Sequence, residues 1–349
     1  MAPRGPERRG SGAGSARNQG GKTMSTMSDP FSFNAGAVES SYVGNLGEAF
    51  RRYGEQNEDV LLISPDLGAG PVTGAFVQQF PERFIDAGIA ECNAMSMAAG
   101  MATYGYKVFV LQMGAFGALK CAEQIRTDLA FSQVPVRILS AWSGLAMGFF
   151  GTTHHAVEDI AITRAIPGLT VLAPADDNAA TAMLSASEQV PGPVFIRLTD
   201  ANIHPVYDAP PEITVGRFGR LRDGVDGTIV GTGLGAQLAA GAAALLAQEG
   251  LSIRVLDAYS LKPLDEAAIV EAARATGAIL TVEEHLVTGG LGSAVGEVLA
   301  RNGLAVAFAI HGLPDETLTV GMPEQLYAHY GLTIEETAQR MRSLVSGKR

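Results

Sequence analysis

One acidic side chain, Glu91, stands where the sequence is expected to pass from a strand into a helix. Its segment, Arg83 to Gly100, reads RFIDAGIAECNAMSMAAG, and small or apolar residues surround the glutamate. A carboxylate removed from water is costly unless it is paired or kept protonated. A glutamate in such a turn therefore predicts an acid that takes part in chemistry.

Two further segments hold residues that could complete a site. The run FGALKCAEQIR begins at Phe116, and the loop GTTHHAVED contains His154 and His155. An aromatic face can stack on a planar ligand, and a histidine near neutrality can both accept and donate a proton. A lone phenylalanine is more often a core residue, and a lone loop histidine is more often structural, so only their combination points to a site.

In combination these segments resemble the transketolase family, whose turn usually reads D-x-G-I-A-E-Q-N. Two later runs, KPLDEAAI from Lys262 and VEEHLVTGGLGSA from Val282, strengthen the resemblance, which covers about residues 40 to 345. The resemblance is to the C-terminal half of that family, as in the small subunit of a split, two-component transketolase. It implies a thiamine-diphosphate-dependent enzyme that transfers a two-carbon ketol unit between carbonyl compounds.

The family's diphosphate-binding motif, Gly-Asp-Gly…Asn, does not occur in the 349 residues. Without a Mg²⁺ site and anion-binding loops a chain cannot hold the charged end of the cofactor. We therefore expect a larger partner subunit to supply the metal site, in an α2β2 heterotetramer whose active sites lie between unlike subunits.

The resemblance also implies roles for individual residues. Glu91 would act as the acid on the aminopyrimidine ring of the cofactor, Phe116 would stack on that ring, and Asp66 would belong to the same cofactor site. His154 matches the histidine that contacts the donor's hydroxyl or carbonyl oxygen. His155 occupies a position usually held by glutamine and is a second candidate for substrate binding.

Departures from the family pattern concern the substrate. The positions of four phosphate-binding side chains hold Ser40, Gly70, Trp142 and Asp200, and the family's sugar-reading aspartate is Phe150. Phosphate recognition by arginine depends on a charge-assisted, bidentate fork, and an aspartate would repel the anion. Trp142 and Phe150 therefore predict a substrate that carries no phosphate and has an apolar portion.

The elements that must position these residues alternate between strands and helices. Apolar runs such as 60–67, 107–113 and 136–142 predict buried strands, and runs such as 118–131 predict helices between them. Continuous apolar strands separated by helices indicate a parallel sheet covered on both faces. The predicted fold class is α/β, with two doubly wound domains, a thiamine-diphosphate pyrimidine-binding domain followed by a transketolase C-terminal domain.

Composition changes divide the chain. Residues 1–37 are rich in Gly, Ser and Arg and predict a disordered tail. Residues 38–205 would form the pyrimidine-binding domain, the proline-interrupted stretch 206–214 a linker, and residues 215–349 the C-terminal domain.

Charge and cysteine content exclude other classes. The net charge of −11 argues against a nucleic-acid partner, and the sequence lacks an apolar run of the ~18 residues that a membrane span needs. Two cysteines cannot build a disulfide framework, which favours reduced thiols in a cytoplasmic protein.

Two alternatives stay open from the sequence. The β subunit of a 2-oxo acid dehydrogenase E1 component shares the domain order and length. The other alternative is a non-catalytic scaffold that holds a nucleotide. GTGLGA at Gly231 follows a predicted strand and Asp257 lies at the end of the next one, which is the pattern of a dinucleotide-binding motif. His285 in the VEEH run is expected to be structural.

Overall fold

The computed structural model describes residues 45–68, 70, 72–199 and 205–347. The expected tail 1–37 and two of the substituted anchor positions, Ser40 and Asp200, lie outside these residues. None of the described helices is long and apolar enough to cross a membrane.

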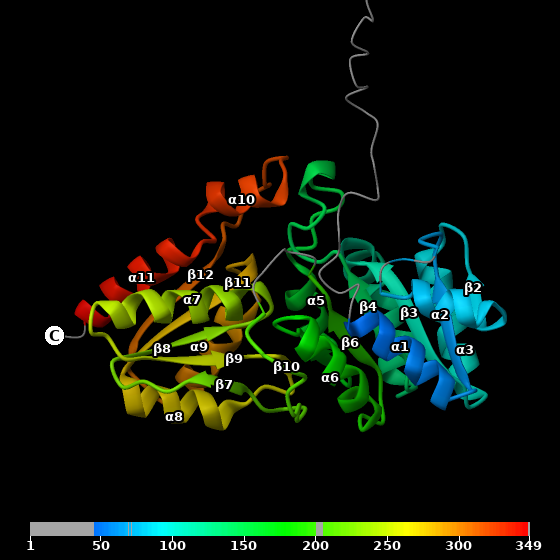
Figure 1. Ribbon diagram of the computed structural model, residues 1–349, viewed down its shortest axis with the longest axis horizontal. Coiled ribbons are helices and arrows are strands. Elements are labelled where there is room, and N and C mark those ends of the chain that lie inside the picture. The colour runs from blue at the N-terminus through cyan, green and yellow to red at the C-terminus, as the bar shows by residue number, and fades with distance from the viewer. Residues whose placement is uncertain (1–44, 69, 71, 200–204, 348–349) are drawn as a thin grey trace, which may run out of the picture. The chain divides into compact units, whose positions relative to one another are not determined.

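The first sheet is mostly parallel (Figure 1). In the described part of the chain its order is β10-β5-β6-β4-β3-β1-β2, and β10 pairs antiparallel with β5. The strands are β1 (Val60–Ser64), β2 (Phe84–Asp86), β3 (Lys107–Met113), β4 (Arg137–Ala141), β5 (Thr170–Leu172), β6 (Val194–Arg197) and β10 (Ser260–Lys262).

Helices cover both faces of this sheet. Leu62 faces the core under α1, α2 and α6, whereas its neighbour Ile63 faces the core under α3 and α5, as the period of two in a strand requires. The helices are α1 (Asn45–Gln56), α2 (Gly74–Gln79), α3 (Glu91–Thr103), α4 (Ala122–Gln124), α5 (Asp159–Ala165) and α6 (Asp177–Glu188).

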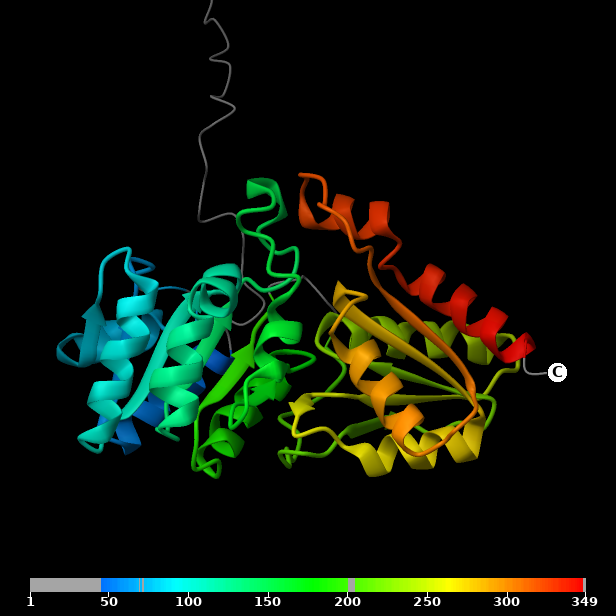
Figure 2. The same cartoon turned by 180° about the vertical axis from the view of Figure 1, so that it is seen from behind.

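The second sheet follows the order β12-β11-β8-β9-β7 within the described residues, with β7 antiparallel at one edge. Alternating residues such as Ile229 and Val230 again point into two separate cores. Seen from behind, the orange α9 lies in front of this sheet and α7 lies on the far side (Figure 2). Its elements are β7 (Gly219–Arg222), β8 (Gly227–Gly231), α7 (Leu234–Gln248), β9 (Ile253–Asp257), α8 (Glu266–Thr276), β11 (Ala278–Leu286), α9 (Leu291–Arg301), β12 (Ala307–Leu313), α10 (Pro323–Tyr330) and α11 (Ile334–Ser346).

Local signals explain where the elements begin and end. In α8, for example, the Asp265 carboxylate accepts from Ala268 N at 3.0 Å, and Gly277 ends the helix in the left-handed region with φ +63°. A side-chain cap and a C-terminal glycine satisfy backbone groups that a helix leaves without partners.

The expected α/β class with two sheets is confirmed, but two features differ from the pattern. The predicted helix 118–131 is a short α4 between two π-helical segments, Phe116–Lys120 and Ile125–Phe131. Strand β10 comes from the second half of the chain yet lies in the first sheet. The sequence pattern could not predict either feature. A π-helical turn is only one residue wider than an α-helical turn, and a strand of three residues is too short to show a period in its apolar residues.

Candidate functional site

The candidate residues follow four neighbouring strands at their carboxyl ends. Asp66 comes after β1, Glu91 after β2, Phe116 after β3, and the loop with His154 after β4. These strands are adjacent and parallel in the order β4-β3-β1-β2, so their carboxyl ends share one edge of the sheet. Ligand sites of open α/β sheets form at this edge.

Glu91 is the first residue of α3, and only 6% of it is exposed. Its carboxylate Oε2 accepts from Lys120 Nζ at 2.5 Å, and its backbone carbonyl accepts from Gln112 Nε2 at 3.0 Å. Burial alone would raise the pKa of Glu91, but the hydrogen bond from Lys120, its positive charge and the backbone N–H of Glu91 together lower it. The side chain is therefore ionised at neutral pH in this chain.

Lys120 has no special signature in the sequence, although it lies in the FGALKCAEQIR run. It ends the first π-helical segment, and about half of its side chain is exposed. Its ammonium group lies 5.9 Å from the ring centroid of Phe116, at the start of the same segment. The widened turn thus places an aromatic face and a cation beside the buried carboxylate; π-helical turns recur at functional sites.

The loop after β4 brings three aromatic rings together. The Phe116 and His154 rings lie 5.2 Å apart, centroid to centroid, in an edge-to-face arrangement, and Phe150 lies 4.7 Å from His154. Thr153 Oγ1 and His154 Nδ1 are 2.8 Å apart. Burial, and secondarily the charge of His155, lowers the pKa of His154, so this ring is neutral at pH 7.

The other sequence candidates lie at the same edge but in different surroundings. His155 is buried, and its Nε2 faces the Gly148 carbonyl at 3.3 Å, inside its own loop. Asp66 is exposed with φ +60°, and its N–H donates to Asp86 Oδ1 at 3.1 Å. Trp142, with φ +51°, begins the loop after β4. Hydrogen bonds do not connect these three residues to the Glu91 carboxylate, so their functional roles stay predictions.

A buried ion-pair network fixes the loop after β4. Arg197 donates to Asp159 Oδ2 at 2.7 Å and to the Glu284 carbonyl at 2.9 Å. The Glu284 carboxylate in turn accepts from Leu145 N at 2.8 Å and from the Tyr327 hydroxyl at 2.5 Å. Residues of β6, α5, β11 and α10 thereby hold the loop at its base.

The approach of Glu284 to this loop needs a glycine. Gly144 has φ +69°, and a Cβ there would lie 2.1 Å from the Glu284 carboxyl carbon. Both the positive φ and the contact exclude an ordinary side chain at this position. This network has no signature in the sequence, because its members are far apart along the chain.

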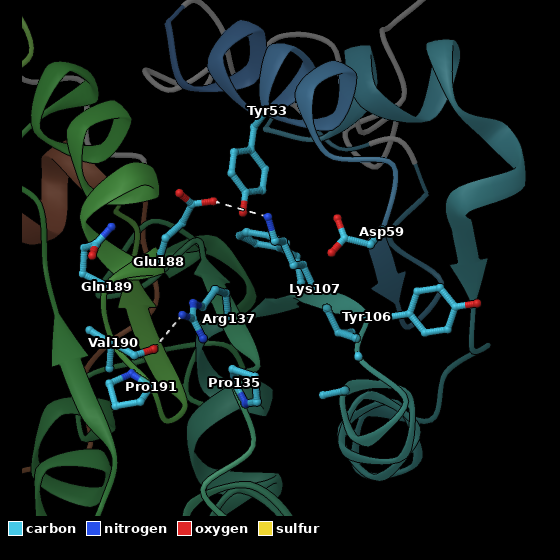
Figure 3. A pocket seen from close by; sticks show the side chains of 14 residues that line it. Tyr53, Asp59, Tyr106, Lys107, Pro135, Arg137, Glu188, Gln189, Val190 and Pro191 are labelled. Atoms are coloured by element: carbon cyan, nitrogen blue, oxygen red, sulfur yellow. Dashed lines mark hydrogen bonds and ion pairs between the residues drawn. The ribbon is translucent and has the colours of Figure 1, made fainter.

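A cavity of about 470 Å³ lies at the opposite, amino edge of the first sheet (Figure 3). Its cations are engaged: Lys107 donates to Asn57 and faces Glu188 at 4.0 Å, and Arg137 donates to the carbonyls of Ser187 and Val190 at 2.6 and 2.8 Å. Arg137 thus satisfies carbonyls at the C-terminal end of α6. The cavity is separate from the carboxyl edge that carries Glu91.

The GTGLGA run, which resembles a dinucleotide-binding motif, is packed against the second sheet and leaves no room for a ligand at its glycines. The first turn of α7 is buried, with Leu234 at 3% exposed, and a Cβ on Gly235 would lie 2.0 Å from the Val282 carbonyl oxygen. Asp257 is fully buried and accepts from the Tyr207 hydroxyl at 2.9 Å, and burial raises its pKa to about 8. The glycines serve close packing of the helix on the sheet, which disfavours the nucleotide-binding scaffold.

His285 is also an interior residue. Its Nε2 accepts from Ala161 N at 3.2 Å, so Nδ1 carries the proton and donates to the Leu286 carbonyl at 2.6 Å. Among the described residues no group of three or more His, Cys, Asp or Glu is arranged to hold a metal ion.

Comparison with known proteins gives consistent matches. Residues 39–205 match the family model of the transketolase pyrimidine-binding domain, and residues 216–336 match that of the transketolase C-terminal domain. The chain is 37% identical over 300 residues to one subunit of the apulose-4-phosphate transketolase of Phocaeicola vulgatus, covering 86% of this chain and 94% of that protein. It is 33% identical over 311 residues to a 6-deoxy-6-sulfo-D-fructose transketolase subunit of a Clostridium species, covering 89% and 95%.

A solved structure agrees with these relatives. A split-gene transketolase, described as an inactive β4 tetramer, superimposes with a TM-score of 0.81 at 34% identity and covers 89% of this chain and 99% of that one. Because the chain matches both domains and nearly the full length of separate transketolase subunits, it belongs to the transketolase family, as a subunit that corresponds to the C-terminal half of the undivided enzymes.

Proposed function

We propose that this chain is the smaller subunit of a split, thiamine-diphosphate-dependent enzyme that transfers a two-carbon ketol unit between carbonyl compounds. The observation that carries the proposal is the buried Glu91 at the start of α3, on the same sheet edge as Phe116 and His154. The split transketolase subunits among the relatives support it.

The residues at this edge fit the aminopyrimidine part of that cofactor. Glu91 offers a carboxylate for a ring nitrogen, and the Phe116 ring, half-buried beside Lys120, offers an aromatic face. When bound, thiamine diphosphate supplies the carbon nucleophile with which the family breaks and forms C–C bonds. Glu91 and Phe116 are the residues of this chain that would hold its ring.

Glu91 and Lys120 together control one proton at this position. At neutral pH the proton belongs to Lys120 Nζ, and Glu91 Oε2 accepts it in a hydrogen bond. The hydrogen bond that Lys120 donates to the Glu91 carboxylate also raises the pKa of Lys120. Because both pKa shifts hold the proton on Lys120, Glu91 presents a carboxylate that could accept a hydrogen bond from a protonated ring nitrogen.

His154 is suited to contact the reacting oxygen atoms of a substrate. Its ring is neutral at pH 7 because burial lowers its pKa, so it can accept a proton from a hydroxyl group. Thr153 orients one nitrogen, and the rings of Phe116 and Phe150 fix the imidazole plane.

The substrate proposed for this site carries no phosphate and has an apolar portion. Phe150, 48% exposed, lies against His154 where the family has an aspartate, and Gly70 and Trp142 replace two of the anchors. The relative from Phocaeicola vulgatus is named for a phosphorylated sugar, so this part needs its own test. If xylulose 5-phosphate and ribose 5-phosphate proved to be the best donor and acceptor of the reconstituted enzyme, the substrate proposal would be wrong.

The proposed partner is a larger cytoplasmic subunit with a diphosphate-binding domain and a Mg²⁺ site, in an α2β2 assembly. The β4 tetramer of the similar structure is described as inactive, which supports the need for a second kind of subunit. Light scattering of the purified complex measures the stoichiometry directly.

The test of the reaction is a product analysis of the reconstituted complex with and without thiamine diphosphate. Ketol transfer yields a new sugar whose chain is two carbons longer than that of the acceptor. A 2-oxo acid dehydrogenase E1 component instead releases CO₂ from a 2-oxo acid and passes on an acyl group. Cofactor-dependent acyl transfer without any ketol product would contradict the proposed function.

A further inference from the structure

The chain has two cysteines: Cys92 directly follows Glu91, and Cys121 directly follows Lys120, the ion-pair partner of Glu91. Cys92 is the second residue of α3 and is partly exposed, whereas Cys121 directly follows the first π-helical segment and is buried. Both are free thiols. Cys92 Sγ donates at 3.3 Å to the carbonyl of Lys120, the residue bonded to Cys121, which places the two cysteines on segments in contact.

Three further contacts hold the two cysteine-bearing segments together. Gln112 donates from Nε2 to the Glu91 carbonyl at 3.0 Å and accepts from Cys121 Sγ through Oε1 at 3.4 Å. Lys120 Nζ contacts the Glu91 carboxylate at 2.5 Å. The residues that precede the two cysteines, Glu91 and Lys120, are thus paired with each other, which holds Cys92 and Cys121 on adjoining segments. A disulfide requires two cysteines that lie close together.

We propose that Cys92 and Cys121 form a reversible intrachain disulfide that switches the Glu91 site off under oxidising conditions. The oxidant is a peroxide: one sulfur attacks a peroxide oxygen and becomes a sulfenic acid as water leaves, and the second thiol then displaces the hydroxyl group as water. Two thiols lose two electrons and two protons, and the peroxide is reduced to two waters. A dithiol reductant reverses the reaction.

The order of events follows from exposure. Cys92 meets the peroxide first, because its side chain is partly accessible and Cys121 is fully buried. Burial also raises the pKa of the Cys121 thiol, which makes it a poor first nucleophile. Because Cys92 Sγ already contacts the residue bonded to Cys121, the Cys121 thiol captures the sulfenic acid before a second peroxide can reach it.

The disulfide would act directly on the carboxylate pair. It removes the S–H donors that now reach the Lys120 carbonyl and Gln112 Oε1, and it draws α3 toward the π-helical segment. Glu91 and Lys120 are the residues immediately before the two cysteines, so their 2.5 Å contact must readjust. The effect on turnover rests on the function proposed above, whereas the formation of the bond does not.

The first experiment measures the bond in the full chain without reference to activity. The chain is treated with equimolar hydrogen peroxide, free thiols are blocked, and the protein is digested with trypsin without reduction. Cleavage after Arg83, Lys107, Lys120 and Arg126 leaves Cys92 in peptide 84–107 and Cys121 in peptide 121–126. We expect these two peptides to be linked, and dithiothreitol to release them. Sulfinic acid at Cys92 or disulfide-linked pairs of chains, without the 84–107/121–126 link, would overturn the proposal.

The second experiment measures the switch in the complex reconstituted with the larger subunit. Oxidation should lower ketol transfer at least tenfold, and dithiothreitol should restore it. The matched Cys92→Ser variant should keep its activity within twofold under the same treatment; Cys92→Ala serves if the serine variant fails to fold by circular dichroism. A linked wild-type chain that stays fully active would refute the switch. Absence of ketol transfer in the reduced complex would instead refute the proposed function, and the peptide link would still decide whether the disulfide forms.

Discussion

At the scale of single residues, the partner of Glu91 decides its chemistry. A carboxylate in an apolar turn leaves two possibilities, a protonated acid or a paired carboxylate. The structure shows the second, with Lys120 at 2.5 Å. Lys120 therefore takes part in how this position handles protons.

The first prediction concerns Glu91 itself. Glu91→Gln keeps the size of the side chain but has neither the negative charge nor the ability to take up a proton, so kcat of the reconstituted complex should fall by about 10²–10⁴-fold. Steady-state kinetics measure this. Glu123→Gln, an exposed position in α4, is the matched control and should stay within twofold of the wild type. Equal losses in both variants would contradict a special role of Glu91.

The second prediction concerns Lys120. In Lys120→Met the burial that raises the pKa of Glu91 remains, while the hydrogen bond and the positive charge that lower it are gone. The pKa of Glu91 must therefore rise, and the acidic limb of the pH profile of kcat/KM should move to higher pH.

The sign for stability follows from the same pKa. The ionised Glu91 stabilises the wild-type fold above its unfolded pKa, and this contribution is lost as the pH falls through the lower, folded pKa. Lys107→Met, which removes a lysine at the amino edge of the sheet, is the control and should leave the acidic limb in place. An unmoved limb in Lys120→Met would show that Glu91 does not set it.

At the scale of elements, the parallel strands of the first sheet place the candidate residues at one edge. The sequence predicted that these loops share one edge, because continuous apolar strands that alternate with helices imply a parallel sheet. The loops are those after β1, β2, β3 and β4. The ring contacts of Phe116 and Phe150 with His154 were not predictable, because they depend on a π-helical turn and on the conformation of a loop. The Arg197 network was not predictable either, because its members lie far apart in the sequence.

The third prediction tests that network. Arg197→Met leaves Asp159 and Glu284 buried with no cation, so the free energy of unfolding should fall by about 3–5 kcal/mol. Urea unfolding followed by circular dichroism measures it. The control is Arg220→Met, which breaks a half-exposed pair with Glu271 and should cost at most about 1 kcal/mol. Similar losses in the two variants would mean that burial of the charges does not matter.

The fourth prediction concerns Glu283, buried at the N-terminus of α9. Burial raises its pKa to about 7, even though Leu291 N and Gly292 N donate to it and Arg197 and Arg164 oppose the rise. Because the folded pKa exceeds the unfolded value of 4.5, this residue stabilises the fold at low pH, and the contribution is lost as the pH rises through about 7. Between pH 5 and 8 the free energy of unfolding of wild type should fall relative to that of Glu283→Gln. A constant difference would contradict the raised pKa.

At the scale of the whole molecule, one chain supplies the pyrimidine-binding and C-terminal domains of the family, and both were predictable from the sequence alone. The resemblance was readable because short, specific runs such as THHAVED and EEHLVTGGLG are retained. The substrate is not readable in the same way, because the side chains that replace the family's anchors, such as Trp142 and Phe150, indicate the polarity of a substrate rather than its identity.

The fifth prediction is that the chain alone binds thiamine diphosphate poorly. In the proposed function Glu91 and Phe116 would hold the ring, but the diphosphate carries the charge and needs groups that we assign to the larger subunit. Titration calorimetry with Mg²⁺ present should therefore show no micromolar binding until that subunit is added. Micromolar binding to the chain by itself would place the diphosphate site here and contradict the proposed division between subunits.

Strand β10 has a consequence for any attempt to separate the two sheets. Residues Ser260–Lys262 pair with β5, so a fragment that stops after the first domain would leave backbone N–H and C=O groups of β5 without partners at the sheet edge. Such a fragment would be prone to self-association through strand addition. We therefore expect both sheets to remain in one polypeptide wherever an enzyme of this kind is split into subunits.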